Sequence, residues 1–139
     1  MKNIFKLIIA TFTITTLSAQ EVKLKKGIVL VDNSVTFSYT KKRMGNELYV
    51  YKLNSEEEYM QLVVDNNNTE SKIDDSKKII FTKQNTTIQS KNFRNRNYEF
   101  LIALLLEEKV IDVNGDVDSN NLTRFKAKYD EKNSNQTMR

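Results

Sequence analysis

The apolar positions along the chain follow a period of two at first, and a helical period from about residue 97 onward. Val35, Phe37 and Tyr39 alternate with polar residues, which is typical of a strand with one buried face. Leu101 and Leu105 belong to a later run in which apolar residues recur every three or four positions. The pattern predicts a sheet followed by helices, which is the arrangement of an α+β domain.

Short strands separated by turn-forming residues are expected in the first part of this pattern. The first is a β-branched run that stops at Asp32-Asn33-Ser34, a trio that favours a turn. Residues 55–58 also fit a capping box before a short helix, but residues 59–64 favour a strand. The expected strands cover residues 22–31, 35–40, 48–53, 58–64, 78–82 and 86–90. They predict an antiparallel β-meander of about five or six strands.

Two helices are expected after the sheet. The first starts at Asn97 and has a broad apolar face, which implies burial against the sheet. The second starts near Asp118 or Ser119, either of which can cap a helix. Its expected buried positions are Leu122, Phe125 and Tyr129. The two helices are predicted to form an αα-hairpin packed on one face of the sheet.

The first twenty residues have the three regions of a secretory signal peptide. Lys2 and Lys6 form the basic region, residues 7–17 form a short apolar region, and Ala19 supplies the small residue that signal peptidase accepts. Cleavage is expected on one side or the other of Gln20. The sequence therefore predicts an exported protein that is periplasmic or secreted.

The same segment is a poor candidate for a membrane anchor. A membrane-spanning helix needs about 20 predominantly apolar residues, and this run is interrupted by four threonines. We therefore expect no stable membrane insertion after signal cleavage. The predicted organisation is a signal peptide at residues 1–20, a single α+β domain at residues 21–130 and a disordered tail at residues 131–139.

The residue types that the chain lacks restrict its chemistry. The 139 residues include no cysteine and no histidine. Disulfides, the usual catalytic triads and the common zinc sites are thereby excluded. The remaining possibilities are a carboxylate-dependent hydrolase, for which Glu47, Glu58 and Asp65 are candidate acids, and the binding of a hard cation through oxygen ligands.

The charge balance gives little support to a nucleic-acid partner. The precursor carries 22 basic and 18 acidic residues, and removal of Lys2 and Lys6 lowers its net charge from +4 to +2. Basic residues alternate with acidic ones along most of the chain, whereas nucleic-acid binding needs them on one face. We therefore expect no nucleic-acid partner.

The segment between the expected helices contains the one candidate metal site. Its oxygen side chains alternate as at the start of an EF-hand calcium loop, although Val117 replaces the required glycine and Thr123 replaces the bidentate glutamate. A structural turn that leads into a helix cap, or a hairpin around Asn114-Gly115, explains the same residues with fewer requirements. The candidate calcium ligands are Asp112, Asn114, Asp116 and Asp118. No other cofactor is expected.

Three stretches of the chain resemble small exported proteins of uncharacterised function from Bacteroidetes. They are the signal ending LSAQ, the segment KKGIVLVDN, and the block EFLIALLLEEKVIDVNGDVDSNNLTRFKAKYDEK. The resemblance implies a location in the envelope or outside the cell, and it carries no assigned activity or functional residues.

These observations together predict a non-enzymatic envelope protein that acts as a binding or interaction module. Its expected partner is a protein or another envelope ligand. Two alternatives stay open: a weak calcium-binding module that uses the 112–118 loop, and a carboxylate-dependent hydrolase.

Overall fold

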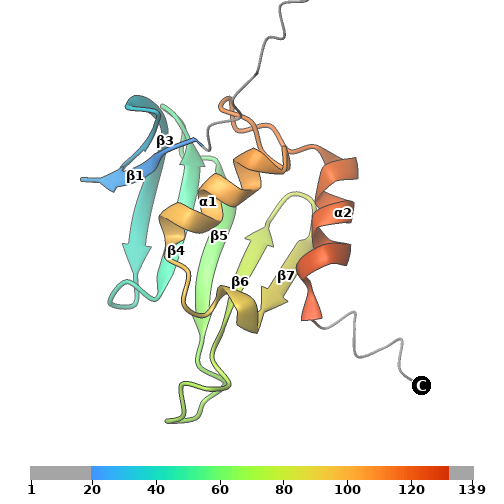
Figure 1. Cartoon of the computed structure of the whole chain (residues 1–139). Helices are drawn as coiled ribbons and strands as arrows, with labels where there is room; N and C mark the ends of the chain where they lie inside the picture. The colour runs from blue at the N-terminus through green and yellow to red at the C-terminus, as the bar shows by residue number, and fades with distance from the viewer. Residues whose placement is uncertain (1–19, 132–139) are drawn as a thin grey trace, which may run out of the picture.

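The computed structural model describes residues 20–131, so the expected signal peptide up to residue 19 and the expected tail from residue 132 lie outside the described residues. Seven strands form one antiparallel meander, in which each strand pairs with its neighbours in chain order (Figure 1). The strands are β1 (Val22–Lys25), β2 (Ile28–Val31), β3 (Ser34–Lys42), β4 (Glu47–Lys52), β5 (Glu58–Asp65), β6 (Ser76–Phe81) and β7 (Thr86–Ser90). The α+β class and the meander are confirmed.

The sheet has seven strands rather than the five or six expected, because residues 22–31 form two strands rather than one. Lys26 and Gly27 have φ angles of 49° and 82° and make a tight turn between β1 and β2. Such two-residue turns match the twist of a hairpin when both residues have positive φ. The lysine at the first turn position concealed the turn, since glycine, asparagine or aspartate is expected there.

The core lies between one face of the sheet and the helices. Along most of the strands the alternate apolar residues point to this face, as the period of two predicts. The fully buried apolar side chains are Val29, Phe37, Leu48, Val50, Met60, Leu62, Ile79, Phe81, Ile88, Leu101, Ile102, Leu105, Val110 and Phe125. Strands and helices therefore share a single apolar cluster.

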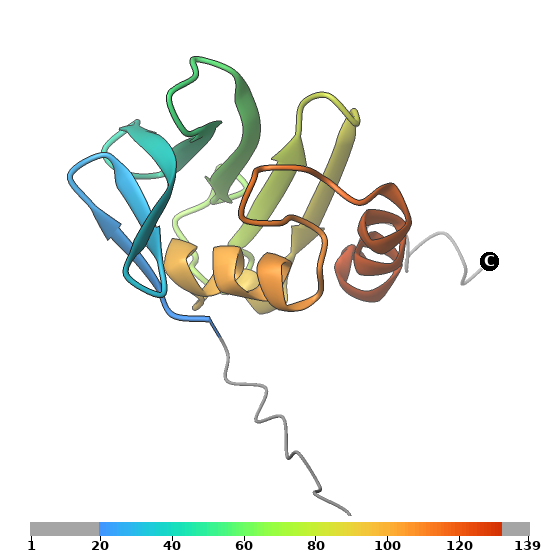
Figure 2. The same ribbon diagram turned by 90° about the horizontal axis from the view of Figure 1, so that it is seen from above.

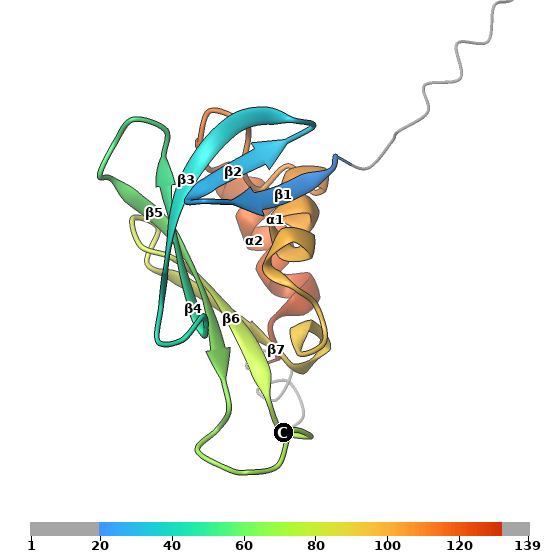
Figure 3. The same ribbon diagram turned by 90° about the vertical axis from the view of Figure 1, so that its left-hand side faces the viewer.

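After the sheet come a short 3-10 helix, η1 (Lys91–Phe93), and the helices α1 (Tyr98–Glu107) and α2 (Ser119–Tyr129). The expected cap of the second helix is confirmed, since Asn121 N donates to Asp118 Oδ1 at 2.9 Å; Asn97 caps α1 in the same way, accepting from Phe100 N at 2.8 Å. Both helices lie on one side of the sheet and leave the opposite side bare (Figure 3). Within residues 20–131, no helix has the length and apolar character needed to cross a bilayer.

The expected αα-hairpin is wrong, since the two helices lie over different parts of the sheet (Figure 2). α1 contacts β1 and α2 contacts β7. Phe125 and Tyr129 of α2 pack against Phe93 of η1, with ring centroids 6.4 and 5.5 Å apart, which holds α2 at the β7 side. The link back to α1 is polar: Tyr129 Oη and Lys128 Nζ donate to Glu108 Oε1 at 2.9 and 2.6 Å.

Candidate functional site

The segment between α1 and α2 folds as a small hairpin, which was one of the alternatives that the sequence left open. Asp118 N donates to the Val110 carbonyl at 2.9 Å, and an antiparallel bridge joins Ile111 to Val117. At the tip, Gly115 N donates to the Asp112 carbonyl at 3.1 Å. We call residues 110–118 the connecting hairpin.

Asp112 and Gly115 explain why the sequence folds in this way. Asp112 Oδ1 accepts the backbone N–H groups of Asn114 at 2.9 Å and Asp116 at 3.0 Å, which stabilises the turn from inside. Gly115 has a φ of +82°, and a Cβ there would lie 3.0 Å from Lys52 Cγ. Backbone conformation and close packing on the end of β4 therefore both require glycine.

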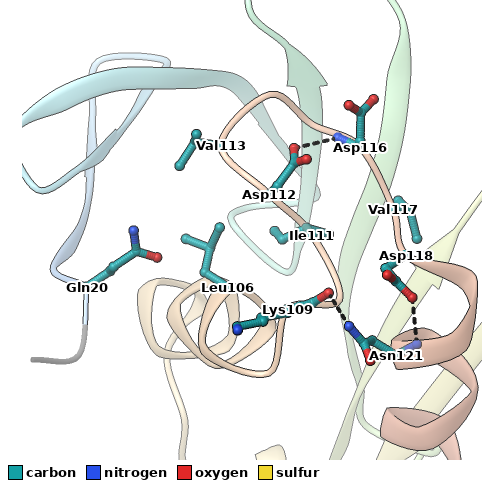
Figure 4. Close-up of a pocket in the computed structure, with 10 residues that line it drawn as sticks. All are labelled: Gln20, Leu106, Lys109, Ile111, Asp112, Val113, Asp116, Val117, Asp118 and Asn121. Carbon is teal, nitrogen blue, oxygen red and sulfur yellow. Dashed lines mark hydrogen bonds between the residues drawn. The ribbon is translucent and has the colours of Figure 1, made fainter. Parts of the chain in front are cut away.

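The four candidate calcium ligands do not form a cation cage. One oxygen of Asp112 already accepts backbone hydrogen bonds within the turn, and one oxygen of Asp118 caps α2. The side chain of Asp116 is 71% exposed and points away from Asp112 (Figure 4). No group of three acidic residues within residues 20–131 is placed to hold a metal ion. Together with Asn114, these side chains fit a structural turn better than the inward-pointing oxygens of an EF-hand.

A cavity of about 550 Å³ opens beside the connecting hairpin (Figure 4). This volume falls within the range of roughly 300 to 1,000 Å³ that is typical of small-molecule sites. Its apolar lining is Leu106, Ile111, Val113 and Val117, and its polar lining is Gln20, Lys109, Asp112, Asp116, Asp118 and Asn121. It brings together the start of the domain, the end of α1, the hairpin and the start of α2.

Lys109 is the one basic residue that lines this cavity. Its φ of 57° ends α1, and the following amide of Val110 donates to the Leu105 carbonyl at 2.9 Å. Its own carbonyl accepts Asn121 Nδ2 at 3.1 Å, which joins the end of α1 to the start of α2. The Lys109 ammonium forms no ion pair with any acid of residues 20–131. The cavity thus presents one free cation and several carboxylates around an apolar wall.

Tyr59 is a buried polar residue near the connecting hairpin that sequence reasoning missed. Its side chain is 2% exposed, and its hydroxyl has no hydrogen-bond partner within the described chain. Burial, and secondly the negative charge of Asp112, raise the pKa of this hydroxyl well above its usual range. A bulge opposite Tyr51 turns both Tyr59 and Met60 toward the core. A strict period of two cannot show such a bulge.

The three candidate acids of a hydrolase lie away from this cavity and are already paired. Glu47 accepts the Tyr49 hydroxyl at 2.6 Å, and Asp65 lies 3.0 Å from Lys78 Nζ. The pKa of Asp65 is lowered by the backbone N–H of Asn67 and then by Lys78. Glu58 and Asp65 stand at opposite ends of β5, roughly 20 Å apart along the strand. A paired-acid mechanism needs about 5 to 10 Å between its carboxyl groups, so Glu58 and Asp65 cannot form the pair, whereas Glu47 stands diagonal to Asp65 in the pairing of β4 with β5.

Comparison with known proteins gives no match: no family model, no curated protein and no solved structure is significantly similar to the chain. The resemblance to exported Bacteroidetes proteins therefore stays a prediction.

Proposed function

We propose that the chain is an exported, non-enzymatic envelope protein that binds a protein or another ligand at the connecting-hairpin cavity. The cavity itself carries this proposal. Its wall is apolar at Leu106, Ile111 and Val117, and charged groups surround that wall. An apolar wall with a few convergent polar groups is the usual composition of a ligand site.

The states of the surrounding acids support binding rather than hydrolysis. Asp112 and Asp118 each use one oxygen to accept backbone N–H groups, so both act in stabilising the fold. Glu58 and Asp65 are separated along β5, which leaves only Glu47 beside Asp65 as a pair of candidate acids. A carboxylate-dependent hydrolase stays the alternative, and turnover of a glycoside by the purified chain would favour it.

Export is tested separately from binding. The full chain, with a C-terminal tag, is expressed in an exporting bacterial host and recovered from the envelope fraction. Intact mass should place the new N-terminus at Gln20 or Glu21. An uncleaved chain that starts at Met1 and stays in the cytosol would contradict export and leave the cavity proposal to its own test.

Binding is tested by crosslinking in the cells that produce the protein, followed by tag capture. Val113 and Val35 are both 49% exposed, but only Val113 lines the cavity. We expect Val113→Glu to lose the captured partner and Val35→Glu to retain it. Equal capture by both variants, or loss with Val35→Glu alone, would place the binding surface elsewhere.

The calcium alternative has a readout of its own. Because the four candidate ligands form no cage, millimolar calcium should leave the melting temperature unchanged. A ligand that binds only the folded state raises this temperature. A rise that Asp116→Asn removes would favour the weak calcium-binding module instead.

A further inference from the structure

Positive charge is concentrated in the first three strands. Residues 22–46, here called the basic lobe, contain six basic residues and one acidic residue, a net charge of +5. Residues 47–131 contain 12 basic and 16 acidic residues, a net charge of −4. The lobe forms the blue and teal side of the sheet (Figure 1). The domain therefore has an asymmetric distribution of charge, although the positive and negative charges of its described residues nearly cancel.

Most of this positive charge is not neutralised locally. Arg43 Nε lies 3.2 Å from Glu47 Oε1, and Lys42 Nζ lies 4.5 Å from the ring centroid of Tyr49. The other cations toward this end are Lys25, Lys26 and Lys41, which are exposed and form no ion pair within residues 20–131. An anionic partner would meet cations that no carboxylate already holds.

An apolar side chain stands at the tip of the lobe. Met44 is fully exposed, at 104% relative accessibility, in the turn between β3 and β4. Gly45 N donates to the Lys42 carbonyl at 3.2 Å, and the Tyr98 hydroxyl donates to the Gly45 carbonyl at 2.8 Å. The base of the turn is therefore fixed, and it presents Met44 outward between cations.

The fold alone does not explain a methionine at this position. Met44 has a φ of 57°, a conformation that glycine, asparagine or aspartate adopts with less strain. Its side chain buries nothing, so it adds no stability to the core. Residues that break a local rule without a structural return are expected at functional positions.

We propose that the basic lobe binds an anionic lipid surface, with Met44 inserted among the headgroups. Clustered lysines and arginines are attracted to anionic lipid, and an exposed apolar side chain among them gains from entering the acyl boundary. Ile28, exposed by 37% on the same lobe, adds further apolar area. This surface lies apart from the connecting-hairpin cavity, so the inference is independent of the proposed ligand site.

A lipid surface accounts for the lobe better than an acidic polypeptide or a nucleic acid. Either of those partners would be satisfied by the cations alone and gives no role to Met44 at the tip. Insertion into a bilayer interface requires cations and an exposed apolar side chain on one turn, and the structure places Met44 beside cations in the turn between β3 and β4.

Vesicle binding by the full chain tests the charge requirement. Phosphatidylcholine vesicles are compared with and without phosphatidylglycerol, at about 0.1 M and about 1 M salt, where the Debye lengths are about 10 and 3 Å. Lys25→Glu with Lys41→Glu removes two unpaired lobe cations, and Lys72→Glu with Arg124→Glu makes the same charge change elsewhere. The expected result is salt-sensitive binding to the anionic vesicles that the lobe variant weakens at least about tenfold and the control less than about twofold. Residues 1–19 contribute equally to every variant.

Insertion is tested with Met44→Trp, because the chain has no tryptophan and the new side chain is its sole indole. Its fluorescence should shift to shorter wavelength on anionic vesicles and not on phosphatidylcholine alone. The proposal is overturned by equal weakening in both charge variants, by binding without a spectral shift, or by binding to polyglutamate and not to vesicles. The last outcome would assign the lobe to an acidic polypeptide.

Discussion

The two edges of the sheet are protected in different ways. At the β7 edge, Gln89 N donates to Asp130 Oδ1 at 3.1 Å and Lys91 N donates to Glu131 Oε1 at 2.9 Å. The two residues that follow α2 therefore bind backbone N–H groups at this edge. β1 pairs only with β2, and the exposed side chains along it are Lys23 and Lys25. Short strands and lysines are a general means of discouraging edge pairing.

The two edges are expected to affect different properties, β7 the stability of the fold and β1 the association of copies. Protection of β7 requires a specific geometry, including the carboxylate of Asp130, which is 6% exposed. Protection of β1 requires only charge and short length. Damage at the first edge should therefore lower the free energy of unfolding, whereas damage at the second should leave it nearly unchanged and alter how copies associate.

The largest expected effect is at the aromatic cluster that docks α2 beside β7. Phe125 is fully buried and packs against Phe93 and Tyr129, with ring centroids 6.4 and 4.5 Å apart. Phe125→Ala should lower the free energy of unfolding by about 3 to 5 kcal/mol, measured by urea denaturation. Arg124→Ala, an exposed change on the same helix, should stay within about 0.5 kcal/mol. A small loss for Phe125→Ala would show that α2 adds little to the closure of β7.

Asp130 tests the edge contact itself. Asp130→Ala leaves the Gln89 N–H without its acceptor, which should cost about 1 to 3 kcal/mol, since an unmet buried donor keeps its desolvation penalty. Asp130→Asn keeps an oxygen at the same place and should cost less. Hydrogen exchange at the Gln89 amide should accelerate in Asp130→Ala and change little in Asp130→Asn. Unaltered exchange in both Asp130 variants would show that Asp130 does not protect this edge.

Asp65 gives the β7 side of the sheet a dependence on pH. It accepts Gln89 Nε2 at 3.1 Å, and its pKa is lowered by the Asn67 N–H and by Lys78. A carboxyl with a lowered folded-state pKa adds stability above its unfolded pKa and loses it as the pH falls through the folded value. Unfolding at a series of pH values should therefore show an acid-side decline that Asp65→Asn reduces. An identical decline in the variant would assign it to other carboxyls.

The fold class and the helix starts could be read from local patterns. Asp118 accepts the cap hydrogen bond expected of it, because capping depends on residues only three positions apart. The placement of α2 could not be predicted from the sequence, since it depends on the contact of Phe125 with Phe93, which is distant in the chain. Periodicity locates an element but does not choose its distant partner.

The candidate site was readable in part for the same reason. The connecting hairpin was one of the alternatives for residues 110–118, because its turn is made by nearby residues. The cavity beside it includes Gln20, which lies far away in the sequence. The inward turn of Tyr59 depends on a bulge in the pairing of β4 with β5. Neither feature leaves a local signal.

The smallest effect on stability, and the sharpest contrast between the two edges, is expected from a single added valine. Lys25 and Thr87 are exposed residues on β1 and β7, and Lys25 has no ion-pair partner within the described chain. Each change to valine should alter the free energy of unfolding by less than about 0.5 kcal/mol. Only Lys25→Val should increase concentration-dependent association in light scattering, since β1 has an open backbone edge and the β7 edge is occupied by Asp130. Equal association in both variants would mean that α2 does not close the β7 edge against a second chain.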